Sequence, residues 1–295
     1  MVPVKFNDYY TINGTGPTFN IKMKPCTRVP KTFHDELLWN AEYIYNHKDG
    51  DIYLFYSGGI DSEYVLEIFL SLGMKIIPVI VRYENDVNLH DIKYAYEYCE
   101  SRKLKPIIVD INFEQLVKSG RYLELAESVN CVAWQFPSLM EATLKFDGTI
   151  LLGSEEPHFS KNKQTQLWYF NEMERITGLW HRWFKKHNIS GTPCMLSYTP
   201  ETIFGFMNDP LVIDLVNNAI LGKEGTNSSK NKIYNRVFNS IMPRIKYTGF
   251  EQIKELPIFH HPDVQKVISD PYDSTLIGNG LYQAEYYKLR DMLTV

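Results

Sequence analysis

The stretch LFYSGGIDSEYVLEIFL, residues 54–70, constrains the fold of this 295-residue chain more than any other segment. A short apolar run ends at Ser57, and an amphipathic stretch with apolar residues at helical spacing begins directly after Gly59. This pattern predicts a strand, a tight loop and a helix. Gly58 and Gly59 carry no Cβ and can adopt positive φ angles, so a ligand can approach the backbone closely.

The first turn of the predicted helix is suited to bind an anion. Its backbone N–H groups lack partners within the helix, and the helix dipole places partial positive charge there. The hydroxyls of Ser57 and Ser62 can add donors. The Asp61 carboxylate would repel a bare phosphate, so its position suggests either a bridging Mg²⁺ or a structural bond to the loop.

The hexapeptide SGGIDS over residues 57–62 resembles the SGGxDS signature of the PP-loop ATP pyrophosphatases. That family includes the synthetase domains of asparagine, NAD and GMP synthetases, the tRNA thiolases and the 7-cyano-7-deazaguanine synthases. The Walker pattern G-x-x-x-x-G-K-[ST] does not occur in the chain. The resemblance is strongest over residues 52–72 and extends through His158. It implies a Rossmann-like fold of the adenine nucleotide alpha-hydrolase type.

The order of predicted elements independently indicates an α/β protein with a parallel sheet. Four segments have strand composition: 52–56, 75–82, 106–111 and 149–152. Helical stretches between them favour right-handed βαβ units, although Pro78 removes one donor from the second strand. We expect an extended segment, a nucleotide-binding domain and a mainly helical extension, over residues 1–32, 33–160 and 161–295. Further predictions are a loop over 222–232 and a last helix over 281–293.

A second group of polar residues follows the fourth predicted strand. Gly153 opens a turn that carries Glu155, Glu156 and His158. Carboxylate oxygens suit Mg²⁺, and a histidine can transfer protons near neutral pH. Lys161 comes just after and can offset charge on a departing pyrophosphate. The alternative is a solvated acidic turn with an incidental histidine and a surface lysine.

The resemblance also implies roles for individual residues. In the family, adenine is held near the end of the second strand, largely by backbone groups, and Val81 and Arg82 match this place. Arg82 is equally well explained as a surface cation. The resemblance assigns the pyrophosphate of ATP to Ser57, Gly58, Gly59, Asp61 and Ser62, with Gly153 nearby. It assigns Mg²⁺ to Asp61 together with Glu155 or Glu156. We expect catalytic contributions from Asp61, Ser62, His158 and Lys161.

The shared reaction of the family gives the first functional hypothesis, an AMP-forming, ligase-like enzyme that uses ATP and Mg²⁺. A small substrate is adenylylated on a carboxylate or carbonyl oxygen, and ammonia, an amine or sulfur then displaces AMP. A second hypothesis is a tRNA or nucleobase modification enzyme of the same family. A third is an ATP- or AMP-binding module without turnover.

Composition narrows these hypotheses. Four scattered cysteines form no CxxC pair, which disfavours the zinc- and cluster-dependent members. Nitrogen or sulfur would come from solution or from a separate donor subunit. The net charge of −4 disfavours broad nucleic-acid binding. Arg236, Arg244 and Lys246, in a basic segment over 223–254, form either a substrate or RNA surface or a solvated helix face.

The aromatic stretch over 168–184 predicts core or an interface, and self-association is one explanation. No apolar run reaches the ~20 residues of a membrane helix, and the N-terminus has no signal pattern. We therefore expect a cytoplasmic protein without membrane contact.

Overall fold

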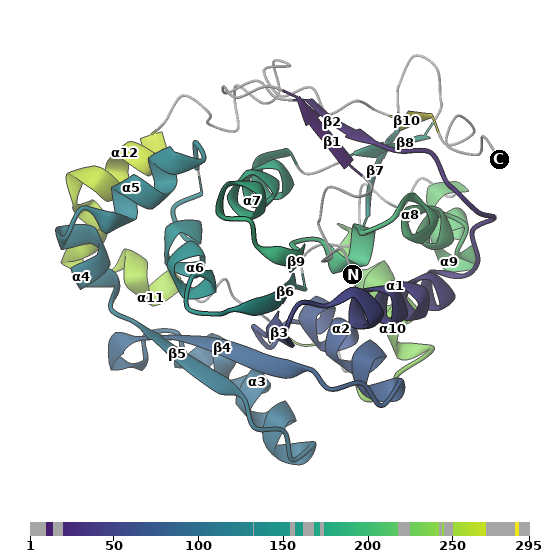
Figure 1. Cartoon of the computed structure of the whole chain (residues 1–295), viewed down its shortest axis with the longest axis horizontal. Coiled ribbons are helices and arrows are strands. Elements are labelled where there is room, and N and C mark those ends of the chain that lie inside the picture. The colour runs from purple at the N-terminus through teal and green to yellow at the C-terminus, as the bar shows by residue number, and fades with distance from the viewer. Residues whose placement is uncertain are drawn as a thin grey trace.

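A parallel sheet with the strand order β5-β4-β3-β6-β9 organises the chain (Figure 1). The computed structural model describes residues 10–13, 20–131, 133–153, 157–161, 168–171, 174–217, 225–241, 244, 250–269 and 287–288. The five strands are β3 (Asp51–Phe55), β4 (Ile77–Tyr83), β5 (Ile107–Ile111), β6 (Gly148–Leu152) and β9 (Ser190–Thr192). The four strands predicted from the sequence are confirmed, with ends that differ by a few residues.

The strand order reverses between β3 and β6. From β3 the chain builds outward through β4 to β5, then returns to the other side of β3 and builds outward through β6 to β9. This is a Rossmann-like α/β arrangement, and the loop that follows β3 lies at its switch point. The fifth strand comes from beyond residue 160, so the sheet extends past the predicted domain boundary.

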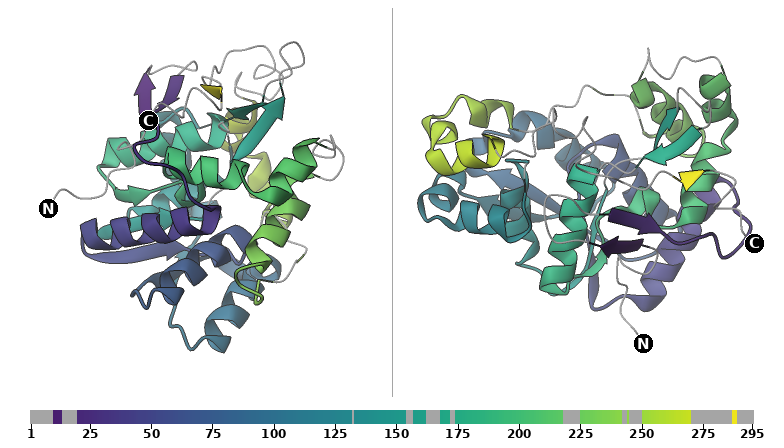
Figure 2. Two further views of the ribbon diagram at one scale, coloured as in Figure 1. Left: turned by 90° about the vertical axis from the view of Figure 1, so that its right-hand side faces the viewer. Right: turned by 90° about the horizontal axis from the view of Figure 1, so that it is seen from above.

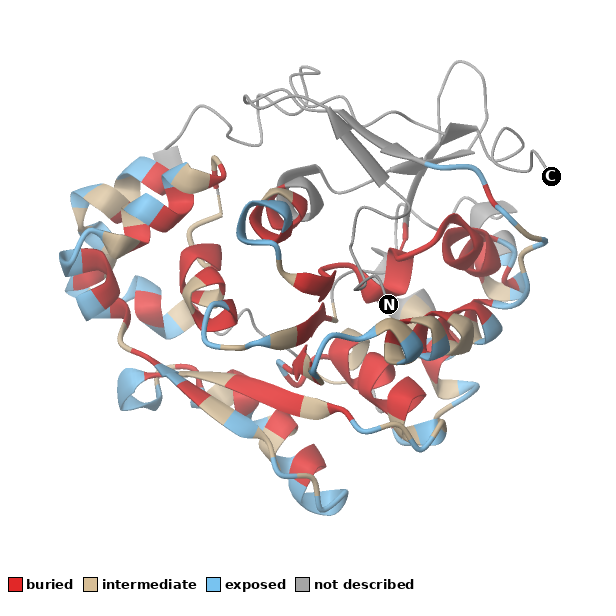
Figure 3. Cartoon of the chain, viewed as in Figure 1, coloured by how far each residue is buried: buried red, intermediate tan, exposed pale blue. Residues whose placement is uncertain are grey.

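The two faces of the sheet bury two separate hydrophobic cores, because side chains alternate along each strand. Leu54 and Tyr56 belong to one core, whereas Phe55 belongs to the other. Figure 3 shows buried residues concentrated along the strands and α2. The first core is covered by α1 (Phe33–His47), α2 (Ile60–Ser71) and α3 (Leu89–Ser101). The second is covered by α4 (Phe113–Lys118), α5 (Arg121–Ser128), α6 (Phe136–Thr143) and α7 (Glu174–His187).

Later helices join both cores and form no separate layer. The first core also takes in side chains of α8 (Pro200–Met207), α9 (Pro210–Asn217) and α10 (Gly225–Asn235). The second takes in side chains of α11 (Glu251–Lys254) and α12 (Pro262–Ser269). Helix α10 occupies residues that the sequence suggested as a loop, so that prediction is wrong from residue 225 onward. Short 3₁₀ turns cover Glu84–Asp86, Met195–Ser197 and Pro257–His260.

Two small antiparallel sheets lie on one side of the molecule, apart from the parallel sheet (Figure 2). One pairs β1 (Tyr10–Asn13) with β2 (Asn20–Met23). The other contains β7 (His158–Lys161), β8 (Trp168–Asn171) and β10 (Tyr287–Lys288). The helix predicted over 281–293 is therefore wrong at Tyr287 and Lys288, which pair with β8. Across the described ranges, no helix has both the length and the apolar character needed to cross a membrane.

Burial of His181 in α7 predicts a loss of stability in acid. The residue is 1% exposed, and burial lowers the pKa of its imidazole from 6.5 to about 3. Between these values the unfolded chain takes up a proton that the folded protein does not, so stability falls as the pH falls. This group contributes a slope of up to about 1.4 kcal/mol per pH unit.

We expect His181→Gln to lose this part of the slope in urea unfolding measured from about pH 6 down to about pH 4. His260→Gln, at an exposed position on the surface, is the matched control and should keep the wild-type slope. Equal slopes in the two variants would contradict the assignment.

Candidate functional site at the switch point

The loop Ser57-Gly58-Gly59 turns the chain from β3 into α2, and its shape requires glycine. Gly58 has a φ of +78°, a left-handed conformation that side chains disfavour. A Cβ at this residue would lie 2.8 Å from the backbone nitrogen of Ala95 in α3. Gly59 is the N-cap of α2 in an extended conformation, without a side chain to cap the first turn. The loop backbone is thus held against α3 while the first turn of α2 stays uncapped by Gly59.

The two loop hydroxyls stabilise the turn itself. Ser62 is 2% exposed, and its Oγ donates to the carbonyl of Gly59 over 2.9 Å. The Ser57 Oγ lies 3.4 Å from the Ser62 Oγ and accepts from the backbone N–H of Gly59 over 3.4 Å. Both serines therefore fix the conformation in which the first N–H groups of α2 are presented.

Gly153, the residue directly after β6, lies against this helix start. A Cβ built on Gly153 would lie 2.4 Å from the Ser62 Cα and 2.7 Å from its Cβ. The structure therefore brings Gly153 to the loop, at the point where the strand order reverses. Glu155 and Glu156 lie outside the described residues. His158 and Lys161 begin and end β7, and their side chains also lie outside the described part.

Asp61 contacts a partner that sequence analysis missed. Its carboxylate accepts hydrogen bonds from Lys230 Nζ and from the Tyr234 hydroxyl, each over 2.9 Å. Both donors belong to α10, where the i, i+4 spacing places them on one face. The sequence suggested a bridging Mg²⁺ or a structural bond to the loop for Asp61, and the observed bonds run to α10 instead; the Mg²⁺ contact stays a prediction. The i, i+4 spacing of Lys230 and Tyr234 was the only signal for this contact in the sequence. The sequence does not indicate that α10 packs on α2.

A buried carboxylate in the same turn holds the end of β3. Glu63 is 2% exposed, accepts from the Tyr56 hydroxyl over 2.8 Å and pairs with Arg244 over 2.6 Å. Burial, followed by the charge of Glu63, raises the pKa of Tyr56, so this hydroxyl remains a donor. Since Tyr56 directly precedes Ser57, the contact fixes the entry to the loop.

The end of β4 is closed by a second residue that sequence analysis missed. Asn88, 4% exposed, donates to the Val81 carbonyl over 3.0 Å and accepts from the Tyr83 N–H over 2.9 Å. Its amide thus continues the hydrogen bonding of β4 beyond the end of β3. A carbonyl oxygen has two lone pairs, so Val81 keeps an acceptor for another partner.

Arg82 forms a two-bond ion pair with Asp110, its partner in the β4–β5 register. The distances are 2.6 Å from Nε to Oδ1 and 3.1 Å from Nη2 to Oδ2. Hydrogen bonding from Arg82 lowers the pKa of Asp110. The Arg82 side chain is therefore engaged on the sheet surface, and its contact with a nucleotide remains a prediction.

Two of the three cations singled out in the basic segment form ion pairs within the chain. Arg236 pairs with Asp209, and Arg244 pairs with the buried Glu63. Lys246 lies outside the described residues. These ion pairs connect the segment to the rest of the chain. They explain the presence of Arg236 and Arg244 without requiring an external ligand.

The acidic and sulfur-containing residues set limits on metal and redox chemistry. No group of three or more His, Cys, Asp or Glu side chains is arranged to hold a metal within the part of the chain that the structure describes. The Mg²⁺ site predicted at Asp61, Glu155 and Glu156 stays a prediction, because both glutamates lie outside the described residues. All four cysteines are buried. Burial raises the pKa of Cys26 to about 12 and that of Cys99 to about 11, which keeps these thiols protonated.

The solved structures that are similar to the chain include the following three. One is described as a predicted subunit of tRNA methyltransferase from Methanocaldococcus jannaschii, with 15% identity, a TM-score of 0.32, and coverage of 53% of this chain and 73% of that one. The NMN synthetase of Francisella tularensis shows 14% identity, a TM-score of 0.31, and coverage of 73% and 97%. The NH3-dependent NAD synthetase of Campylobacter jejuni shows 16% identity and a TM-score of 0.31. The match covers 73% of this chain and 97% of that one.

No protein-family model and no curated protein sequence matches the chain. All three structural similarities are weak, and the fold is defined by the sheet order and loop geometry of the chain itself. The hexapeptide SGGIDS, which resembles the PP-loop signature, lies at the switch point of a Rossmann-like parallel sheet.

The close approach of Gly153 to Ser62 predicts that Gly153→Ala disrupts the loop. The added methyl group must displace backbone, at a cost of about 1–3 kcal/mol, and should weaken ATP binding. Gly73→Ala, at the other end of α2, is the control, because its φ is +64° but no atom lies within 4 Å of the added Cβ.

The control should lose about 1 kcal/mol from its left-handed conformation and keep its affinity for ATP. Urea unfolding and calorimetric ATP titration measure the two effects. A Gly153→Ala protein with wild-type stability and affinity would refute the packing argument.

Proposed function

We propose that the chain is an ATP pyrophosphatase-type enzyme that adenylylates a small substrate and then releases AMP. The observation that supports this best is the glycine loop at the switch point, with the first turn of α2 packed against Gly153. Backbone N–H groups and the helix dipole favour anions at such a place, and ligands of open α/β sheets bind there.

The reaction would proceed in two displacements. A carboxylate or carbonyl oxygen of the substrate attacks the α-phosphorus of ATP, and the bond from that phosphorus to the bridging oxygen breaks. Its electron pair leaves with pyrophosphate. A nucleophile with a lone pair (ammonia, an amine or a sulfur donor) then attacks the activated carbon, and the carbon–oxygen bond to AMP breaks. Charge grows on the leaving pyrophosphate, where fixed donors stabilise it most.

The chain's own residues would divide the work. The loop Ser57–Ser62 holds the pyrophosphate through N–H groups kept in place by the two serine hydroxyls. Val81 offers its backbone to adenine. Asp61, Glu155 and Glu156 would hold Mg²⁺, which supplies positive charge to the phosphates when bound. His158 would transfer protons, and Lys161 would add charge near the leaving group.

Two other functions account for the loop less completely. A nucleic-acid modification enzyme needs cations that neutralise phosphates, whereas the charges of Arg236 and Arg244 are compensated by Asp209 and Glu63 within the chain. The intact SGGIDS hexapeptide over residues 57–62 counts against a binding module without turnover, and an assay for AMP and pyrophosphate distinguishes the two functions. An enzyme that acts on a small molecule requires the SGGIDS loop and needs no cationic surface, so it agrees with both observations.

Asp61→Asn should reduce pyrophosphate release about 100-fold or more, the usual cost of removing one electrostatic contact to a transition state. Asp51→Asn is the matched control, because Asp51 lies at the opposite end of β3 and pairs with the exposed Lys75 over 2.8 Å. Purified protein is given Mg²⁺, ATP, ammonium and a pool of small carboxylates, and AMP and pyrophosphate are measured. ATP binding without formation of AMP in the wild-type protein would overturn the enzyme proposal.

The nucleic-acid alternative makes a separate prediction about salt. We expect tRNA binding, measured by fluorescence anisotropy, to be weak and to show little dependence on salt concentration. A protein that neutralises several phosphates loses affinity steeply as salt increases. Tight tRNA binding with a steep salt slope would favour the modification enzyme over the small-molecule enzyme.

A further inference from the structure

Lys230 is the cation that the fold brings to the start of α2. Its side chain is 11% exposed, and its Nζ lies 2.9 Å from Asp61 Oδ2. The other carboxylate oxygen of Asp61 accepts from Tyr234, one helical turn further along α10. Asp61 and Lys230 are separated by 169 positions in the sequence, so tertiary packing alone creates the contact.

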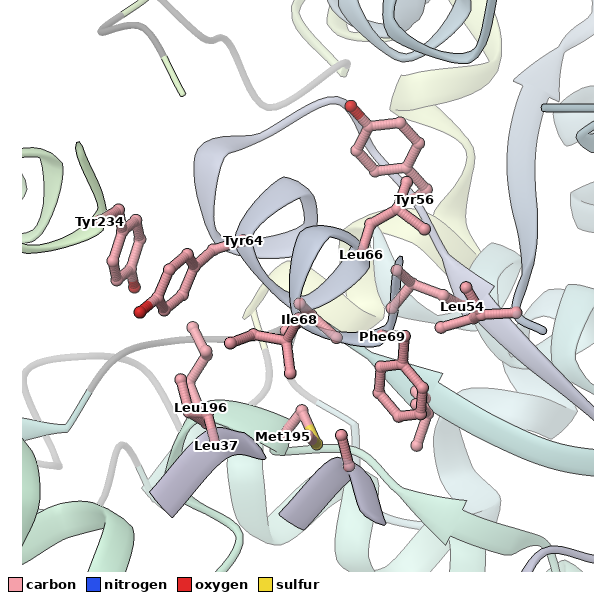
Figure 4. Close-up of a cluster of buried hydrophobic side chains, with 14 of the residues drawn as sticks. Leu37, Leu54, Tyr56, Tyr64, Leu66, Ile68, Phe69, Met195, Leu196 and Tyr234 are labelled. Carbon is pink, nitrogen blue, oxygen red and sulfur yellow. The ribbon is translucent and has the colours of Figure 1, made fainter. Parts of the chain in front are cut away.

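Helix α10 is fixed to α2 by apolar contacts independent of this ion pair. The rings of Tyr64 and Tyr234 stack with centroids 4.2 Å apart and an interplanar angle of 11° (Figure 4). Phe238 meets Tyr64 edge-on at 5.5 Å, and Ile233 is buried in the same core. Lys230 therefore keeps its position at the loop even when its partner changes.

Charge at the loop explains why a lysine is useful there. Asp61 places a negative charge in the turn whose N–H groups attract phosphate, and Lys230 compensates that charge. The largely buried ion pair between Asp61 and Lys230 has a stronger electrostatic attraction than it would have in water. A triphosphate carries more negative charge than one carboxylate and therefore competes for the lysine. The long, flexible lysine side chain ends in three donors, so it can turn from a carboxylate to a phosphate oxygen without movement of the helix.

The other cations near α2 do not offer this option. Arg244 is held by Glu63, which also accepts from Tyr56, and Arg102 is held by Glu67, which also accepts from Ser240. Those carboxylates are 2% and 4% exposed, so removal of the arginine would leave a buried charge. The Asp61 side chain is 21% exposed and can be solvated or bind a metal instead.

We propose that Lys230 is a catalytic residue that exchanges Asp61 for the β- and γ-phosphate oxygens of ATP. In the nucleotide-free protein it neutralises Asp61. With ATP bound it contacts the departing pyrophosphate, and Asp61 becomes available to Mg²⁺. This inference rests on the proposed function and adds a residue from α10 to the site.

The test compares the binding of inorganic pyrophosphate, ATP and AMP to Lys230→Gln by calorimetry. We expect the affinity for pyrophosphate and ATP to fall about 10- to 100-fold, the usual effect of losing a charged hydrogen bond, and the affinity for AMP to stay unchanged. Lys232→Gln, an exposed neighbour on the same helix, is the charge-matched control and should bind all three normally. Equal losses for AMP and pyrophosphate would indicate a structural role and overturn the proposal.

A second measurement follows Mn²⁺ binding to the nucleotide-free protein by proton relaxation. Lys230→Gln should bind Mn²⁺ several-fold more tightly than the wild type, because Asp61 loses its counter-charge, and Lys230→Gln with Asp61→Asn should lose that gain. Unchanged Mn²⁺ affinity in the single variant would contradict the exchange. Tyr234→Phe, which leaves the charges intact, should change pyrophosphate affinity little.

The two proposals fail in different ways. If wild-type protein forms AMP and Lys230→Gln keeps its pyrophosphate affinity, the function stands and the role of Lys230 falls. If wild-type protein binds ATP without turnover and Lys230→Gln loses pyrophosphate affinity selectively, the contact stands and the enzyme proposal falls. Wild-type protein that binds neither ATP nor pyrophosphate would overturn both.

Discussion

The site depends on close backbone contacts at the start of α2. The loop before α2 contacts helix α3, and the first turn of α2 contacts the residue after β6. Gly58 lies against Ala95 of α3, and Gly153 lies against Ser62, so there is no room for a Cβ on either side of the first turn. Protein interiors are close-packed, and a shift of one element at such a contact moves the others. The loop conformation is thus a property of three packed segments. This explains how an uncapped helix start can keep its N–H groups aimed at one point.

The second constraint is the charge carried by α2, a helix whose residues from Ser62 to Phe69 are all buried. A buried carboxylate costs several kcal/mol unless it is paired, so Glu63 and Glu67 require partners from other elements. Arg244 and Ser240 supply them from the segment after α10. That segment is therefore tied to α2 by contacts to buried carboxylates, although its composition suggested a basic surface. The same contacts bring α10 over the loop.

Local sequence predicted what local physics determines. The loop over 57–59, the strand before it and the helix after it were predicted from the placement of glycine and the spacing of apolar residues. Pro78 is tolerated because Val79 bonds toward β3, which turns Pro78 toward β5, and the β4–β5 ladder begins only at Val79. The missed elements depend on distant contacts: β9 forms by pairing with β6, and Tyr287 joins β8. Lys230 was missed for the same reason. Asn88 bonds to nearby residues of β4 and was missed because the sequence does not indicate which backbone groups its amide faces.

The three carboxylates of α2 are each compensated by a cation from another element, in the ion pairs Asp61–Lys230, Glu63–Arg244 and Glu67–Arg102. Attraction for a polyphosphate must then come first from the backbone donors and the helix dipole, which act over a short range. Arg244, whose guanidinium lies 5.3 Å from the ring centre of Tyr94, is compensated by Glu63 and adds little to that attraction. The pair at the loop is the most exposed of the three on its acidic side. Under the proposed function, a bound triphosphate would redistribute charge most easily at Asp61 and Lys230, and this pair would couple nucleotide binding to the packing of α10.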